Sequence, residues 1–178
     1  MSPHAMPSSA APGAQPAHAP DAHDPRLATW RTFLRAHARI TRRLDEELQA
    51  NHGLSLAEYD ALLQIAAAPE RRLRMNLIAE RVLLSRSGVT RLIDRLVAEG
   101  AVERVACTTD ARGAEATLTA AGLDRLRGAS RTHLAGIERY FLDTIPAGDR
   151  EVIERGLSRV VEAIGPQAAD CQPAATES

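Results

Sequence analysis

Apolar residues recur at alternating three- and four-residue spacings over much of the chain, a pattern typical of amphipathic helices. The first run starts at Leu27 and ends at Gly53, because glycine readily adopts the left-handed backbone of a helix end. Ser55 can cap a second run, which stops before Pro69 because the residue preceding a proline disfavours helical backbone. The pattern therefore predicts two helices before residue 69.

Two further helices follow, joined by a tight turn at Leu83 and Leu84. The first begins near Asn76, taken as its cap, and the second is capped by Ser85 and ends at Gly100. The same spacing turns one face of the second helix toward a core. The residues predicted on that inward face are Val89, Leu92, Ile93, Leu96 and Val97.

The segments 101–106 and 114–119 are short, and the polar loop between them predicts a β-hairpin. Thr119 caps a long helix that reaches Phe141, and a last helix follows Pro146 and continues to Ile164. Residues 1–25 hold six of the ten prolines, so we expect this segment and residues 166–178 to be disordered tails. The predicted fold is mainly α with one small β-hairpin.

Charge is balanced over the whole chain, with 22 basic and 23 acidic residues, but it is unevenly distributed. Between Arg71 and Arg112, nine arginines stand against five acidic residues. A basic segment in a nearly neutral protein indicates a specific site for a polyanion rather than general adhesion to anionic surfaces.

The helix after the tight turn concentrates this charge on one side. With its apolar face inward, the helical period turns Arg86, Ser87, Thr90 and Arg91 outward. Arginine can bridge the O6 and N7 acceptors of guanine, and the hydroxyls can reach bases or phosphates. Arg95 lies further along, where we expect a contact with a phosphate. This order of elements is that of a winged helix-turn-helix, in which the second helix enters the major groove of DNA.

The tip of the hairpin contains Asp110, Arg112 and Gly113. An arginine in the narrow minor groove meets concentrated negative potential, and a carboxylate two residues earlier can orient its guanidinium. A solvated loop with a weak surface ion pair is the alternative. Because the tip directly follows the arginine-faced helix, we predict that Asp110 and Arg112 contact DNA.

The run RLRMNLIAERVLLSRSGVTRLIDRLVAEGAVERVACTTDARGAEATLTAAG, within residues 54–126, resembles the MarR family of transcriptional regulators. The resemblance rests on the order of its parts: a helix starting at 74–76, the SRSGVTRLIDRL pattern, the GAVER segment leading into the hairpin, the tip just described and the LTAAG segment after it. It implies a domain over residues 26–165 with a winged helix-turn-helix lobe over 54–122. The segments 26–53 and 123–165 are then dimerisation helices.

The same resemblance implies a homodimer that places two recognition helices in successive major grooves of a pseudo-palindromic operator in double-stranded DNA. Many members bind a small aromatic or phenolic acid between the dimerisation helices and the DNA-binding lobe, which weakens operator binding. Trp30, His37 and Tyr59 are the polar-capable rings on helices that would line such a crevice, with ordinary core packing as the alternative for each. The expected function is a repressor released by an aromatic ligand.

Catalysis and metal binding find no support in the sequence. A Gly-rich phosphate loop, a nucleophile elbow and a His, Cys and acid constellation are all missing, so we expect neither an enzyme nor a cofactor. Cys107 and Cys171 lie far apart, and His37, His52 and His133 lack the spacing of a helical ligand pair, so no metal site is predicted.

Two further expectations concern location and partners. The chain shows neither a membrane-spanning apolar run nor a signal-peptide pattern, so we expect it in the cytoplasm. A winged-helix module that contacts only proteins is the main alternative function, since a fold does not fix a function. RNA binding is less favoured, because single-stranded recognition uses exposed aromatic rings and the basic face has none.

Overall fold

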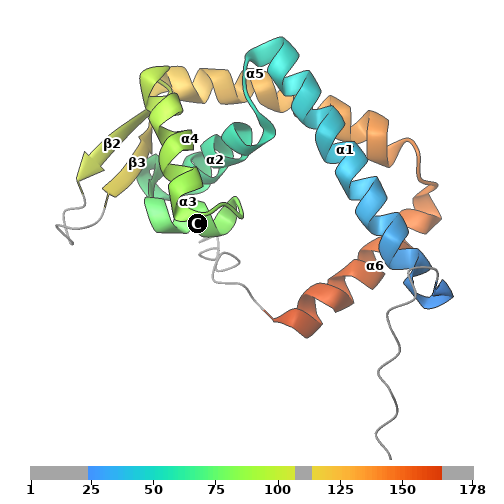
Figure 1. Cartoon of the computed structure of the whole chain (residues 1–178). Helices are drawn as coiled ribbons and strands as arrows, with labels where there is room; N and C mark the ends of the chain where they lie inside the picture. The colour runs from blue at the N-terminus through green and yellow to red at the C-terminus, as the bar shows by residue number, and fades with distance from the viewer. Residues whose placement is uncertain (1–23, 107–113, 166–178) are drawn as a thin grey trace, which may run out of the picture. The chain divides into compact units, whose positions relative to one another are not determined.

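The structure is a computed structural model that describes residues 24–106 and 114–165 (Figure 1). The chain divides into two compact units, Met1–Ala36 and His37–Ser178. The described part of the first unit holds a 3-10 turn, Pro25–Leu27, capped by the Asp24 side chain, and the beginning of helix α1, Ala28–His52. The expected tails and the hairpin tip lie outside the described residues, and the domain boundaries stay predictions.

The second unit contains the rest of α1 and most of the regular structure. Its further elements are α2 (Leu56–Ala67), a 3-10 turn (Pro69–Arg71), β1 (Arg72–Arg74), α3 (Met75–Arg81), α4 (Arg86–Ala98), β2 (Val102–Ala106), β3 (Ala114–Leu118), α5 (Ala120–Ile137), a π-helical turn (Glu138–Leu142) and α6 (Ala147–Ile164). No helix in the two described ranges is both long and apolar enough to cross a bilayer.

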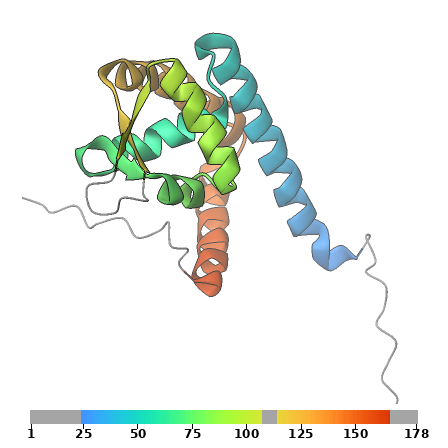
Figure 2. The same ribbon diagram turned by 60° about the vertical axis from the view of Figure 1, so that its left-hand side comes forward.

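The sheet is antiparallel with the strand order β1-β3-β2, so β3 lies in the centre. The hairpin of β2 and β3 confirms the sequence prediction, and it pairs Val102 with Leu118. The strand β1, which pairs Leu73 with Ala116, was not predicted because three residues are too short to show a period. Helices α2, α3 and α4 gather beside this sheet (Figures 1 and 2).

The core of the second unit lies among α2, α3, α4 and the sheet. Four of the five residues predicted on the inner face of α4 are buried, and Leu62, Ile65 and Ile78 from α2 and α3 are buried with them. The prediction for Val97 is wrong, because this residue sits on the last turn of α4 at the edge of the core and is 37% exposed. The mainly α fold with a small sheet is confirmed.

Three of the helices have a hydroxyl side chain as their N-cap. Ser55, Ser85 and Thr119 each accept a backbone N–H of the first turn, as the sequence predicts. The cap predicted at Asn76 is wrong, because β1 leads directly into α3 and leaves the extended residue Arg74 at the cap position.

The segment LTAAG closes tightly on the end of α4. Thr119 donates its hydroxyl to the carbonyl of Gly100 at 2.7 Å, and its backbone N–H bonds the carbonyl of Ala101 at 3.1 Å. A methyl group at Gly122 would lie 2.0 Å from that same Ala101 oxygen. Only glycine at this position lets α5 start against the chain that enters β2.

We predict that Gly122→Ala destabilises the protein by about 1–3 kcal/mol, because the methyl must displace backbone rather than a flexible side chain. Gly128→Ala is the matched control on the same helix, since its nearest neighbour would be a His52 ring atom at 3.8 Å. Alanine there should stabilise the helix by about 0.5–1 kcal/mol. Urea unfolding followed by circular dichroism measures both, and equal stability of the two variants would contradict the packing described.

Candidate nucleic-acid interface

Helix α4 has one buried and one exposed face. The buried side chains, each no more than 2% exposed, are Val89, Leu92, Ile93 and Leu96. The exposed side chains are those that the helical period turns outward, Arg86, Ser87, Thr90 and Arg91. The helix therefore presents two guanidinium groups and two hydroxyls to solvent.

Hydrogen bonds order the first turn of this exposed face. The Ser85 hydroxyl accepts the backbone N–H of Gly88 at 3.1 Å and lies 3.2 Å from the Ser87 hydroxyl. Thr90 donates its hydroxyl to the carbonyl of Arg86 at 3.0 Å, which leaves the threonine oxygen able to accept. Within the described part of the chain, neither Arg86 nor Arg91 has an ion-pair partner, so both charges remain available to a polyanion.

An ion pair ties the same helix to the hairpin. Arg104 on β2 lies 2.8 Å from the carboxylate of Asp94 and also donates to the carbonyl of Thr90 at 3.2 Å. The hairpin strand and α4 are thereby fixed to each other at a point beside the exposed hydroxyl of Thr90.

A second ion pair ties α4 to the start of α2. Arg95 donates its Nε to Glu58 Oε1 at 2.7 Å, and the other carboxylate oxygen accepts the backbone N–H and the hydroxyl of Ser55, both at 2.9 Å. The Arg95 side chain is still 56% exposed, whereas that of Glu58 is 6% exposed. The expected phosphate contact of Arg95 stays a prediction, and the structure adds that Glu58 orients its guanidinium.

Glu58 is held in its charged form. Burial raises the pKa of this carboxyl. The hydrogen bonds from the Ser55 N–H, the Arg95 guanidinium and the Ser55 hydroxyl, together with the arginine charge, lower the pKa by more than burial raises it. The net effect is a pKa below the ordinary glutamate value. The negative charge that anchors Arg95 is therefore maintained at neutral pH.

A third contact fixes the far end of α4. The guanidinium of Arg125 on α5 pairs with Glu99, the residue that ends α4, and donates to the carbonyls of His52 and Gly53 at 3.2 and 3.0 Å. One arginine thus joins the ends of α1 and α4 to the first turns of α5.

The DNA contacts predicted for the hairpin tip fall in a segment that the structure does not describe. Asp110 and Arg112, together with Cys107, lie outside the described residues, so their contact with DNA stays a prediction.

The three candidate ligand rings lie in different surroundings. Trp30, in the first unit, is 55% exposed and stacks on Phe33 at 5.9 Å between ring centroids. In the second unit His37 is exposed, whereas Tyr59 is buried with its hydroxyl 3.4 Å from Ser130. Tyr59 therefore has the surroundings of a core residue, and the ligand role of all three stays a prediction.

Sequence reasoning missed the residues that position α4. The pattern of Ser55 and Glu58 is a visible capping box, but its partner Arg95 is 37 positions away and no local rule joins them. The contact of His133 with Tyr59 was also not predicted: the two rings lie 4.5 Å apart, and Nδ1 of His133 is buried without a hydrogen-bond partner in the described structure. Burial lowers the pKa of His133 and keeps its ring neutral.

Comparison with known proteins places this geometry in a family. A family model described as MarR family matches residues 52–113. The crystal structure of Sco3205, a MarR family transcriptional regulator from Streptomyces coelicolor in complex with DNA, is 30% identical, covers 80% of this chain and 89% of its own, and has a TM-score of 0.71. The chain belongs to the MarR family.

Other solved structures agree with this membership. AbsC, a MarR family transcriptional regulator from Streptomyces coelicolor, is 28% identical, with a TM-score of 0.74 over 84% of this chain and all of its own. A mutant of MarR from E. coli in complex with operator DNA shares the fold, at 21% identity and a TM-score of 0.69 over 80% of this chain and 99% of its own. No match was found among curated protein sequences. MarR-family proteins are transcriptional regulators, so the expectation that the chain is not an enzyme is confirmed.

We predict that Arg95→Gln lowers the slope of log binding constant against log salt for double-stranded DNA by about 0.9 for each phosphate that the arginine neutralises in the wild type. Arg95→Lys keeps a charge and should retain the slope. Arg127→Gln is the control, since among the described residues Arg127 pairs only with its helix neighbour Asp124 on α5. An unchanged slope in Arg95→Gln would mean that this arginine acts solely within the protein, through Glu58.

Proposed function

We propose that this MarR-family regulator is a cytoplasmic repressor that binds a pseudo-palindromic operator as a homodimer and is released by a small aromatic acid. The observation that carries the DNA contact is the pair of arginines on α4 without ion-pair partners in the described structure, Arg86 and Arg91. They lie beside the hydroxyls of Ser87 and Thr90 on a helix whose other face is buried. Guanidinium and hydroxyl groups are the donors that guanine and phosphate oxygens accept.

A protein-interaction module is the second candidate, and the charges argue against it. An unpaired arginine at the centre of a protein interface would have to be desolvated, which costs free energy unless the partner supplies an acidic group. A helix with two unpaired arginines is better suited to the phosphates and base edges of DNA. Sco3205, the relative at 30% identity, was solved with DNA bound.

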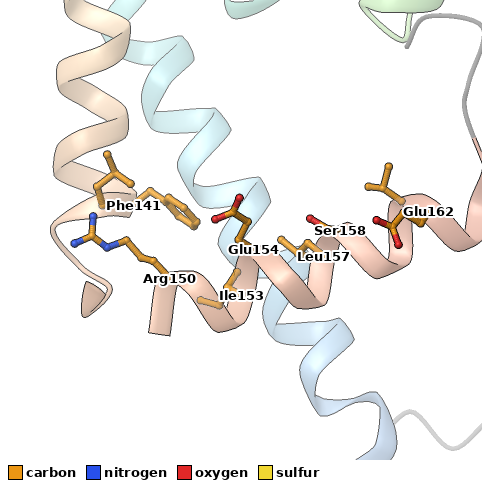
Figure 3. Close-up of a pocket in the computed structure, with 9 residues that line it drawn as sticks. Phe141, Arg150, Ile153, Glu154, Leu157, Ser158 and Glu162 are labelled. Atoms are coloured by element: carbon orange, nitrogen blue, oxygen red, sulfur yellow. The ribbon is translucent and has the colours of Figure 1, made fainter. Parts of the chain in front are cut away.

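The homodimer is supported by apolar surface on α6. None of the residues of α6 is buried, and it exposes the apolar side chains of Val152, Leu157, Val160, Val161 and Ile164. Between α6 and the turn at Phe141 lies a pocket of about 730 Å³ that includes Ile153, Leu157 and Glu154 (Figure 3). Extended apolar surface of this kind marks an association site.

The first unit also exposes large apolar side chains. Leu27 in the 3-10 turn and Trp30, Phe33 and Leu34 at the start of α1 are each more than 40% exposed. A second copy of the chain would cover such surface. It would also duplicate α4, so two half-sites about one helical turn apart are expected in the operator.

We predict that binding to the DNA upstream of the protein's own gene weakens with salt along a log-log slope of several units, because each phosphate contact releases counterions. Arg91→Ala should cost about 1–3 kcal/mol at one base position and little when that base is already substituted. Fluorescence anisotropy with a series of single-base variants measures both.

Two outcomes would contradict these statements separately. Salt-insensitive or absent binding by the wild type would refute the DNA contact itself. An equal loss for Arg91→Ala on every sequence would refute only base reading by Arg91 and leave a phosphate contact. Arg112→Ala, in the hairpin tip, should weaken binding without changing the base preferences that Arg91 sets.

For the effector, we predict that phenolic acids such as salicylate release the DNA from the wild type at lower concentration than from Trp30→Ala. The reason is that Trp30 offers an exposed ring and an indole N–H to an aromatic anion. Tyr59→Phe removes only a buried hydroxyl near Ser130, and an unchanged release curve for this variant would assign that hydroxyl to the core rather than to the ligand site. Identical release curves for wild type and Trp30→Ala would remove Trp30 from the site.

A further inference from the structure

Leu83 stands in the turn between α3 and α4 with its side chain in solvent. It is 79% exposed, more than any other large hydrophobic residue in the ranges that the structure describes. Its neighbours Val82 and Leu84 are both partly buried and pack against the core. The exposure is therefore specific to this position in the turn.

The backbone at Leu83 is unusual for a leucine. Its φ of 55° lies in the left-handed region, which glycine adopts freely and side chains with a Cβ adopt with strain. This conformation ends α3, because it lets the N–H of Leu84 reach the carbonyl of Ala79 at 3.0 Å. Glycine would make the same turn without strain, so the leucine side chain is not explained by folding.

The turn leads directly into the exposed face of α4. Ser85, two residues after Leu83, caps that helix, and Arg86 and Ser87 follow at once. Leu83 thus lies two residues before the cap of a helix whose exposed face bears guanidinium and hydroxyl groups. In the major groove of DNA, the apolar group that the bases offer is the C5-methyl of thymine.

We propose that Leu83 packs against the C5-methyl group of a thymine in the operator and so selects thymine at one position of each half-site. The inference rests on the proposed DNA contact of α4 and adds a determinant of specificity to its arginines. The place of Leu83 just before that helix favours DNA over a protein partner as the group that covers it.

The experiment is a cycle between protein and DNA. The DNA is the duplex that the wild type protects upstream of its own gene, with each thymine replaced in turn by deoxyuracil, which removes only the methyl group. At one thymine per half-site, we expect the wild type to bind about fourfold more weakly, the value of burying one methyl-sized group. Leu83→Ala should bind the thymine and deoxyuracil duplexes equally well.

Two controls separate this contact from folding. Leu83→Gly should unfold at no lower urea concentration than the wild type, because glycine relieves the left-handed strain. Like Leu83→Ala, it should bind the thymine and deoxyuracil duplexes equally well. Leu63→Ala, a leucine on α2 that is 41% exposed, should keep the fourfold discrimination.

If Leu83→Ala discriminates thymine from deoxyuracil as the wild type does at every position, the proposed contact is overturned while DNA binding stands. If the wild type binds no DNA, both the contact and the proposed function fail.

Discussion

Burial of one face of α4 is the constraint on which the arrangement of this protein depends. Each aliphatic side chain that is fully removed from water contributes about 1.5–3 kcal/mol, so the four on α4 supply roughly 6–12 kcal/mol before entropy is counted. That is comparable to the whole net stability of a typical domain, and an exposed ion pair contributes less than about 1 kcal/mol. The rotation of α4 about its axis is therefore set by its apolar residues, and the outward direction of Arg86 and Arg91 is a consequence.

Polar contacts then fix the exact position of α4 against its neighbours, which apolar burial alone does not determine. Apolar packing is not directional, whereas the pairs of α4 with Glu58, Arg104 and Arg125 each join particular atoms on α2, β2 and α5. The buried Glu58 matters most among them, because removing one partner of a buried pair leaves a charge without compensation. A helix that reads base edges needs this precision, since its donors must meet acceptors within a few tenths of an ångström.

The parts of the fold that sequence predicts are those with local causes. The period of α4 and the caps at Ser85 and Thr119 depend on neighbours within four residues, and the structure confirms them. The strand β1 and the requirement for glycine at Gly122 depend on contacts between distant segments, so no local sequence pattern indicates them. The inward position predicted for Val97 was wrong for a related reason, since a helical period does not show where the core ends.

The candidate site divides in the same way. The outward residues of α4 follow from its helical period. The pairing of Arg95 with Glu58 became apparent only in the tertiary structure, and it shows that the guanidinium predicted to contact a phosphate is oriented by a carboxylate. Leu83 was predicted only as part of a tight turn. Its left-handed backbone and its exposure became apparent only in three dimensions.

The central claim is that the arginine-bearing face of α4 enters the major groove of DNA, and methylation interference tests it most directly. Dimethyl sulfate methylates guanine N7, the acceptor in the major groove that arginine bridges, and adenine N3 in the minor groove. We predict that guanine methylation blocks binding at two clusters of positions about one helical turn apart on the upstream DNA. Binding that tolerates guanine N7 methylation everywhere, or interference confined to adenine, would contradict the account.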